Sequence, residues 1–549
     1  MKKLSVFLLS LLVVANAHAG VIFQAFYWDA PSDGQNQWWN RLSQQSHELS
    51  KSGFSAIWLP PALKCASGGY SVGYDPFDDY DLGSKDQRGS IPTHWGTKTS
   101  LVNAVATFRA NGLDVYLDMV LAHRGGDDGN KNFYYLNARG DALTGRFAKS
   151  ANDFTTQDSM FGRQINHYSP YMRKGLIEAG QWQAETLGTQ GMRFDHVKGV
   201  PADFLGEYLT TGSLQNQFAF VEYWDEDPFV LSNYLSHGLF GRASVLDFPL
   251  WGKLKAMANA KGFFNLRELV HAGYVARDAR SAVTFVENHD TDRSFPTVSN
   301  KTLSYAFILT SEGYPTVFWK DYYDYGLKPA IDTLLWIHNI LASGSTIYRW
   351  ADDDFLVYER QGGPKLLVGL NDNMVASRRE WVATSFGPKV KLVDYSGGHG
   401  EIETNDQGWA YLEVKPNSYA AYAPKGIVSS MVKTMHYTTQ VFRGSDDLDI
   451  PAANSDTFTP VETLRILGGT NLKWWVDLET NDRAFVEVRA VTASGETRSL
   501  FRGTVSQKSA SGSLGIHQTD VYRLEILVGT GKPVSTPFKF TVNYLAPQQ

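Results

Sequence analysis

Three acidic residues stand at or just beyond the ends of short apolar runs, where side chains from separate strands can meet. They are Asp195, Glu222 and Asp290. When carboxylates lie close together, ionising a second one beside the first is unfavourable, so one group keeps its proton. Glycosidic bond cleavage needs one protonated and one ionised carboxyl group, because the acid protonates the leaving oxygen while the carboxylate attacks or stabilises the sugar carbon. If the three residues converge, the sequence indicates this chemistry.

Basic and neutral donors accompany the acidic residues. Arg193 precedes Asp195 by two positions, and residues two apart on a strand point to the same side. Its guanidinium is therefore expected to keep Asp195 ionised. His123 and His289 are expected to donate hydrogen bonds to sugar hydroxyls.

The elements that must position these residues alternate between short β-branched or aromatic runs and longer amphipathic stretches from residue 20 to 343. Eight such runs predict a closed α/β barrel of the (β/α)8 type, whose chemistry lies at the C-terminal strand ends. The expected strands are residues 21–26, 56–59, 114–117, 191–194, 218–221, 244–248, 283–286 and 316–319.

Further domains interrupt and follow the barrel of residues 20–343. The interval after the third strand is too long for an ordinary connection, and it predicts an inserted subdomain at about 124–170. Alternating patterns then predict an antiparallel β domain at 344–425 and, after a short linker, a C-terminal β-sandwich at 432–546.

Charge and cysteine content exclude several classes of protein. A formal net charge of −6 supplies no basic field for nucleic acid. The single cysteine, Cys65, rules out an intramolecular disulfide and has no partner at nucleophile or metal-ligand spacing, so we expect a buried thiol. An aromatic share of 13% suits flat, weakly polar ligands.

The first nineteen residues have the three parts of a secretory signal. Two lysines precede an apolar run, and Ala17-His18-Ala19 follows it, which predicts cleavage after Ala19 and export. We find no other uninterrupted apolar stretch of ~20 residues, so no membrane partner is expected.

Five segments together carry a family resemblance. They are DMVLAH at 118–123, GMRFDHVK at 191–198, VEYW at 221–224, FVENHD at 285–290 and GYDPFDDYDLG at 73–83. The first four, in this order, resemble the signatures of the α-amylase family of glycoside hydrolases, and the segment at 73–83 agrees with the same family. The likeness is strongest to bacterial secreted α-amylases. It covers about residues 20–425.

The resemblance implies an enzyme that retains the α configuration. We predict that it cleaves internal α-1,4-glucosidic bonds in starch, glycogen and maltooligosaccharides, and we expect a monomer. Asp195 would be the nucleophile, Glu222 the general acid/base and Asp290 the transition-state stabiliser. The substrate-binding residues that it implies are Tyr74, His123, Arg193, Lys198 and His289.

The chain departs from the family pattern where a structural calcium ion is usually bound. The usual asparagine is replaced by Ala122 and the usual aspartate by Gln164. A methyl group cannot coordinate calcium, and a neutral amide is a weaker ligand than a carboxylate. The usual site is therefore in doubt, although Asp127, Asp128 and Asp153 remain as ligands for a different one.

Two other departures bear on cofactors and chemistry. Thr316 stands where chloride-activated relatives carry a basic residue, so no essential chloride is expected. Glu287 replaces an aspartate before Asn288, and we expect the chemistry to survive this change. No phosphate-binding loop occurs in a suitable context, and no organic cofactor is expected.

Several hypotheses about the function are compatible with this sequence. An exo-acting, maltooligosaccharide-forming enzyme, a transglycosylase and a noncatalytic glucan-binding relative would share the same fold. In the C-terminal segment, Trp474 and Trp475 indicate either starch binding through an outward ring or local packing.

Overall fold

The computed structural model describes residues 20–31, 37–125, 147, 149–159, 162–239, 241–294, 298–429 and 496, and eight strands between residues 437 and 545. The predicted signal sequence lies outside the described residues. No helix among those described has both the length and the apolar character needed to cross a bilayer.

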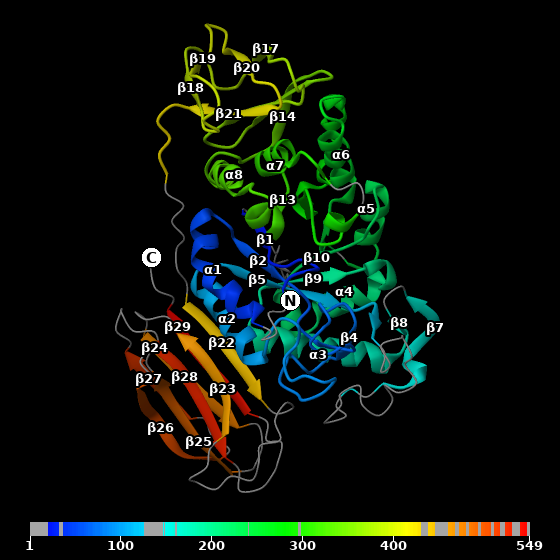
Figure 1. The fold of residues 1–549 in the computed structure, drawn as a ribbon, viewed down its shortest axis with the longest axis vertical. Coiled ribbons are helices and arrows are strands. Elements are labelled where there is room, and N and C mark those ends of the chain that lie inside the picture. Colours follow the sequence, from blue (N-terminus) through cyan, green and yellow to red (C-terminus); the bar gives the residue numbers. More distant parts are fainter. Residues whose placement is uncertain are drawn as a thin grey trace, which may run out of the picture.

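Eight parallel strands close into a barrel at the centre of the molecule (Figure 1). Around the barrel the neighbouring strands follow the order β1-β13-β12-β11-β10-β9-β5-β2. The strands are β1 (Ile22–Gln24), β2 (Ala56–Leu59), β5 (Asp114–Val120), β9 (Gly191–Asp195), β10 (Phe218–Val221), β11 (Ser244–Leu246), β12 (Ala282–Phe285) and β13 (Tyr314–Phe318).

The barrel strands are buried on both faces of the sheet, which explains why their sequences are almost continuously apolar. Every residue of β2, β9 and β13 is buried, because helices cover the outside and side chains fill the inside. The predicted barrel is therefore confirmed. Strand ends differ by a few residues: β5 continues to Val120, which carries Asp118 inside the strand, and β12 ends at Phe285.

Among the described residues, seven α-helices connect successive barrel strands and an eighth, α8, follows β13. Local signals fix their ends: Ser169 accepts a hydrogen bond from the backbone of Met172 at the start of α3, and Gly188 ends that helix in the left-handed region. The helices are α1 (Trp38–Ser52), α2 (Lys98–Ala110), α3 (Pro170–Leu187), α4 (Ala202–Thr210), α5 (Pro228–Ser236), α6 (Phe248–Asn259), α7 (Lys301–Thr310) and α8 (Lys328–Ile340).

The described part of the insertion after β5 is a small antiparallel sheet in the order β6-β8-β7, formed by β6 (His123–Arg124), β7 (Phe154–Ser159) and β8 (Gly162–Ile165). Buried charges join it to the loop after β2, which contains β3 (Lys64–Cys65) and β4 (Pro76–Asp78). The carboxylate of Asp79 contacts Arg124 at 2.5 Å and Lys149 at 2.6 Å, and all three side chains are almost fully buried.

An antiparallel domain follows the barrel. Its larger sheet has the order β14-β15-β16-β21-β18-β19, and β17 pairs with β20 in a separate two-stranded sheet. The strands are β14 (Thr346–Ala351), β15 (Phe355–Arg360), β16 (Leu366–Asn371), β17 (Arg378–Ala383), β18 (Lys391–Asp394), β19 (Ile402–Glu403), β20 (Trp409–Val414) and β21 (Ser418–Pro424).

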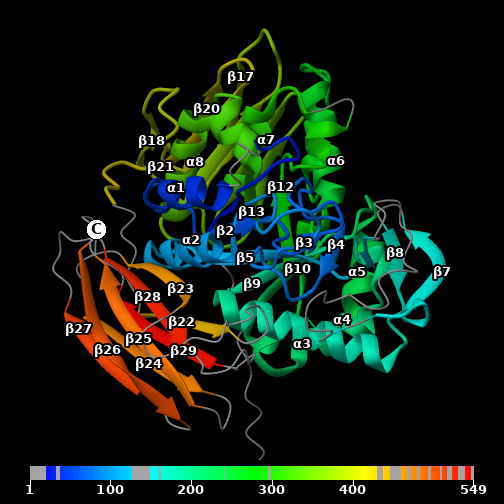
Figure 2. The same ribbon diagram turned by 60° about the horizontal axis from the view of Figure 1, so that its bottom comes forward.

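The C-terminal segment contributes two four-stranded antiparallel sheets, β22-β29-β24-β27 and β23-β28-β25-β26. Its strands β22 and β23 lie beside α2 and α3, at the end of the molecule away from β17 and β20 (Figures 1 and 2). Trp474 and Trp475 occupy successive positions of β24, and their side chains lie outside the described part of the chain. The strands are β22 (Tyr437–Gly444), β23 (Thr459–Ile466), β24 (Asn471–Leu478), β25 (Arg483–Val491), β26 (Thr497–Ser506), β27 (Ala510–Gly515), β28 (Tyr522–Gly529) and β29 (Phe538–Leu545).

The Asp79 ion pairs predict a stability effect. Burial alone would raise the pKa of Asp79, but Arg124 and Lys149 lower it to about 2. Its contribution to stability is therefore present above the ordinary pKa of about 3.9 and is lost as the pH falls through about 2. At pH 7, Asp79→Asn leaves two buried cations uncompensated and should lower the free energy of unfolding by ~3–5 kcal/mol.

Denaturant unfolding at pH 7 measures this effect. The control is Asp203→Asn, because Asp203 is 67% exposed and pairs with Arg173 at the surface. The control should change stability by less than ~1 kcal/mol. Equal effects of the two substitutions would contradict a special role for the buried pairs.

Candidate active site

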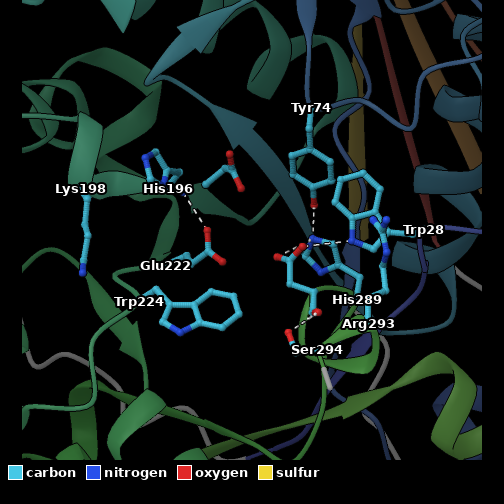
Figure 3. Close-up of a pocket in the computed structure, with 11 residues that line it drawn as sticks. Trp28, Tyr74, His196, Lys198, Glu222, Trp224, His289, Arg293 and Ser294 are labelled. Atoms are coloured by element: carbon cyan, nitrogen blue, oxygen red, sulfur yellow. Dashed lines mark hydrogen bonds and ion pairs between the residues drawn. The ribbon is translucent and has the colours of Figure 1, made fainter. Parts of the chain in front are cut away.

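A cavity of about 640 Å³ opens at the C-terminal ends of the barrel strands. Glu222, Trp224 and Lys198 stand on one side of it, and Tyr74, Trp28 and His289 stand on the other (Figure 3). Such a cavity, with aromatic rings and a few polar groups, suits a polyhydroxylated ring. Its lining is formed by Trp28, Tyr74, Asp195, His196, Lys198, Glu222, Trp224, His289, Asp290, Arg293 and Ser294.

The guanidinium of Arg193 organises the acidic residues of this cavity. Its Nη1 donates to Asp118 Oδ1 and Asp195 Oδ1, both at 2.8 Å, and its Nη2 lies 3.0 Å from Glu222 Oε2. These side chains are at most 9% exposed. Three neighbouring strands supply them, since β9 lies between β5 and β10 in the barrel. One fixed cation therefore sets the positions of three carboxylates.

Burial and mutual repulsion make this cluster hold protons. Burial raises the pKa of Asp195, Arg193 opposes the shift, and the charges of Glu222 and Asp118 add to it. Burial likewise raises the pKa of Asp118 to about 6 although Arg193 acts against it. Burial also raises the pKa of Asp290. Since one guanidinium cannot balance three carboxylates, the cluster retains a proton more readily than isolated acids do.

A chain of hydrogen bonds fixes the opposite wall. Gln24 Nε2 donates to His289 Nδ1 at 2.8 Å, and His289 Nε2 lies 2.7 Å from the hydroxyl of Tyr74. That hydroxyl in turn donates to Asp118 Oδ2 at 2.9 Å. Burial lowers the pKa of His289 well below its usual value. A neutral imidazole with its proton on Nε2 satisfies all of these contacts.

The rings of this wall are stacked. The rings of Tyr74 and His289 lie 5.3 Å apart and nearly parallel. Trp28 lies 5.1 Å from Tyr74, and its Nε1 donates to Asp290 Oδ1 at 3.0 Å. The guanidinium of Arg293 lies 4.8 Å from the centre of the Trp28 ring. Asp290 is thus held by an indole that itself packs against the Tyr74 ring at a tilt and against the guanidinium of Arg293.

The other wall is formed around Glu222. The backbone N–H of His196, a residue in the left-handed region, donates to Glu222 Oε2 at 2.9 Å. Lys198 pairs with Asp225 at 3.3 Å and remains 41% exposed. Trp224 stacks on Phe248 and keeps more than a third of its surface exposed. This side of the cavity therefore offers a cation and a broad aromatic edge.

The structure brings most of the sequence-predicted site residues to one cavity. Asp195, Glu222, Asp290, Tyr74, Lys198 and His289 line it. Arg193 and His123 lie deeper, and His123 Nε2 contacts the backbone carbonyl of Tyr74 at 2.8 Å. The predicted contact between Arg193 and Asp195 is present.

Sequence reasoning did not single out Asp118, Trp28, Trp224 or Arg293 as site residues. The position of each residue in the sequence or in the strand register nevertheless indicates that it lies near the site. Asp118 is the register partner of Arg193 on the adjacent strand, and Trp28 lies just past the end of β1. Trp224 and Arg293 follow Glu222 and Asp290 by two and three positions.

At the corner where the family resemblance implies a calcium ion, the described residues Ala122 and Gln164 offer a methyl group and a neutral amide. Ala122 is fully buried, and the amide of Gln164 donates to the carbonyl oxygen of Gly199 at 3.5 Å. Asp153 accepts bonds from the backbone and hydroxyl of Ser150, while Asp127 and Asp128 lie outside the described residues. Within the described chain, no three His, Cys, Asp or Glu side chains are grouped to hold a metal ion.

Glu287 has a structural neighbourhood of its own behind the cavity. Its Oε2 lies 3.2 Å from Lys301 Nζ, which also contacts Asp321 at 2.5 Å. The side chain of Glu287 is fully buried, and the residue is not part of the cavity lining. Compared with an aspartate at this position, the longer side chain of Glu287 takes part in a buried ion pair with Lys301 and leaves Asp290 in place.

Comparisons with known proteins agree with this architecture. The family model described as the C-terminal domain of α-amylases matches residues 366–423. The glucan 1,4-α-maltohexaosidase of Bacillus sp. (strain 707) is 28% identical, over 75% of this chain and 93% of its own. The α-amylase of Bacillus licheniformis is also 28% identical, over 74% of this chain and 94% of its own.

Solved structures show the same fold. An Anoxybacillus α-amylase matches with a TM-score of 0.61 and 18% identity, over 75% of this chain and 99% of that one. The barrel, its acidic cavity and these relatives together define a glycoside hydrolase of the barrel type. More narrowly, the C-terminal family model and the named relatives make the chain similar to the α-amylase family along about three quarters of its length.

The Arg193 cluster predicts a shifted pH profile. Because burial raises the pKa of Asp195, the acid limb of kcat/KM should lie above the ordinary aspartate pKa of about 3.9. Arg193→Gln removes the opposing charge, so the limb should move up by about 1–3 units. Arg193→Lys keeps the charge and should give a smaller shift. Hydrolysis of a chromogenic maltooligosaccharide between pH 4 and 9 measures both.

Near-UV circular dichroism checks that each Arg193 variant is folded. Arg173→Gln, which alters a surface ion pair, is the control and should leave the limb in place. An unchanged acid limb in a folded Arg193→Gln enzyme would refute the assigned role of the guanidinium.

Proposed function

We propose that the chain hydrolyses internal α-1,4-glucosidic bonds of starch, glycogen and maltooligosaccharides with retention of configuration. The observation that carries the proposal is the shared guanidinium: Asp195 and Glu222 both contact Arg193, at 2.8 and 3.0 Å. This contact holds two carboxyl groups at one cavity, as a double displacement requires. Relatives named α-amylase support the choice of substrate.

In the first displacement, Glu222 donates its proton to the glycosidic oxygen while Asp195 attacks the anomeric carbon. Asp195 Oδ1 accepts from Arg193, so Oδ2 is the oxygen assigned to the attack. The C–O bond to the leaving sugar breaks, and a covalent glycosyl ester forms. In the second displacement, Glu222 takes a proton from water, the water oxygen attacks the same carbon, and Asp195 is released.

Asp290 and its neighbours are assigned to the distorted sugar ring. Trp28 holds Oδ1 of Asp290. Oδ2 of Asp290 lies 3.3 Å from His289 Nε2 and is the oxygen assigned to sugar hydroxyls. Tyr74 and His289 present a stacked pair of rings on the same wall. Hydrogen bonds to sugar hydroxyls that strengthen in the transition state supply part of the catalysis.

An exo-acting enzyme of the same fold is the second candidate. The observation that favours it is the likeness to a maltohexaosidase and to a maltotetraohydrolase from Roseateles saccharophilus, the latter 26% identical over 71% of this chain. These names describe enzymes that release one product length. A transglycosylase would use the same covalent intermediate with a sugar in place of water.

Export of a monomeric enzyme is part of the proposal. The N-terminal lysines, apolar run and Ala17-His18-Ala19 support secretion. One relative, a cytoplasmic α-amylase of Escherichia coli that is 28% identical, shows that the family also works inside cells. The three residues assigned to catalysis, Asp195, Glu222 and Asp290, line one cavity of a single chain, which supports the monomer as the catalytic unit.

The proposal assigns no calcium ion to the corner of Ala122 and Gln164 and no chloride ion to the barrel. The buried methyl and the Gln164 contact to Gly199 support the first assignment. The buried Thr316 hydroxyl supplies no cationic partner for chloride. We assign the stabilisation of the insertion against the loop after β2 to the ion pairs of Asp79 with Arg124 and Lys149.

The general acid is tested by Glu222→Gln. The variant should fold and bind glucan but lose about 10²–10⁴ in kcat, because an amide cannot donate the required proton. Glu226→Gln is the matched control, since Glu226 is exposed and outside the cavity lining. Unchanged turnover of Glu222→Gln would refute the assignment. NMR of the first product should show the α-anomer, and a first-formed β-anomer would exclude the double displacement.

Timed product analysis on soluble starch separates the candidates. A broad range of early fragments is expected for internal cleavage, whereas one dominant short product would favour exo action. No hydrolysis by the wild type would favour a noncatalytic glucan-binding relative.

The same samples test the metal assignment. Adding EDTA should leave both the product pattern and the thermal unfolding midpoint unchanged. A midpoint that falls with EDTA and returns with calcium would contradict the assignment.

A further inference from the structure

The two-stranded sheet of β17 and β20 has one buried and one open face. Val382, Ala410, Leu412 and Val414 point into the core of the antiparallel domain and are at most 1% exposed. The alternate positions face outward. Three of them carry large rings, Trp381, Trp409 and Tyr411, which are 46%, 42% and 41% exposed. We call these three rings the aromatic strip.

The strand register makes the strip continuous. Trp381 stands opposite Tyr411, and their ring centres are 5.2 Å apart. Trp409 lies two residues from Tyr411 on the same strand, about 7 Å along it. Opposite Trp409 stands Ala383, whose small side chain adds no bulk beside the ring. Flat apolar surfaces therefore follow one another along the hairpin.

The charges around the strip cancel. Arg379 stands opposite Glu413, and Arg379 Nη2 lies 2.9 Å from Glu413 Oε1. A neutral surface of this kind does not attract nucleic acid or an anionic membrane. It suits a neutral ligand that presents apolar ring faces to aromatic side chains and hydroxyls to their polar edges. A sugar chain has this chemistry.

The size of the strip argues against a second copy of this chain as its occupant. Two paired six-residue strands offer a face on the order of 200 Å², from a length of ~20 Å and a width of ~10 Å. A stable protein–protein interface buries about 800 Å² on each partner. The C-terminal sheets do not cover the strip either, because they lie at the opposite end of the molecule (Figures 1 and 2).

The strip is separate from the catalytic cavity, whose lining residues all lie between Trp28 and Ser294. We propose that the strip is a second α-glucan-binding site, where Trp381, Trp409 and Tyr411 stack on glucose rings of a polymeric substrate. This inference rests on the proposed function for its ligand. Bound there, a long chain stays near the cavity while its other segments are cleaved, whereas a short oligosaccharide gains nothing.

The kinetic test uses the full chain with Trp381→Ala and Tyr411→Ala combined. Both side chains are partly exposed, so the variant should keep its thermal unfolding midpoint. KM for soluble starch should rise about fivefold, which corresponds to the loss of ~1 kcal/mol of stacking. The kcat/KM for maltotriose should remain within twofold of the wild-type value. Phe263→Ala, at a ring that is 93% exposed and outside the strip, is the control and should change neither.

A local test locates the bound sugar. In the Glu222→Gln background, hydrogen–deuterium exchange with β-cyclodextrin should slow at residues 378–383 and 409–414, and the double substitution should abolish this protection. Unchanged exchange there, together with an unchanged KM for starch, would overturn the inference while leaving the catalytic proposal intact. If the wild type hydrolysed no α-glucan, the catalytic proposal would fail, and the exchange experiment would still decide whether the strip binds sugar.

Discussion

One buried guanidinium sets the geometry on which the catalytic cavity depends. Arg193 contacts carboxylates from β5, from the end of β9 and from just beyond β10. Taking four charged groups out of water is costly, and the cost is offset only when the partners meet with good hydrogen-bond geometry. Strand register brings the partners together, since Asp118 and Phe220 stand opposite Arg193 on its two sides. Nη1 then donates to Asp118 and Asp195, while Glu222 forms an ion pair with Nη2. The cluster therefore exists only when the barrel is closed.

The opposite wall depends on the same closure. Asp290 follows β12, Trp28 follows β1 and Tyr74 comes from the loop after β2. Through Tyr74 and Asp118 the hydrogen-bond chain that begins at Gln24 reaches the carboxylates held by Arg193. The two walls are thus one connected network. Each wall presents both kinds of group: Glu222 and Trp224 lie on one, and Asp290, Tyr74 and His289 lie on the other.

Outside the cavity, two other features differ in their physical role: the buried ion pairs of Asp79 and the exposed aromatic strip. The insertion is fastened by two cations on Asp79, and the antiparallel domain presents an uncharged row of rings on β17 and β20. Buried charges such as Asp79 are stable only when every charged group has an oppositely charged partner, so they favour a single packing of the insertion against the barrel. Exposed rings such as those of the strip cost little to maintain, because a half-buried aromatic residue already packs against its own strand.

The amino-acid sequence alone determined the barrel, the approximate positions of its eight strands and the motifs around Asp195, Glu222 and Asp290. These follow from apolar runs of strand length and from local motifs, which are properties of neighbouring residues. It did not determine that Asp118 shares the guanidinium of Arg193, that Trp28 holds Asp290, or that three rings of β17 and β20 form one row. Those contacts join residues as far as 262 positions apart. Only closure of the barrel and pairing of the strands decide them, because distance along the chain carries no record of which side chains share a surface.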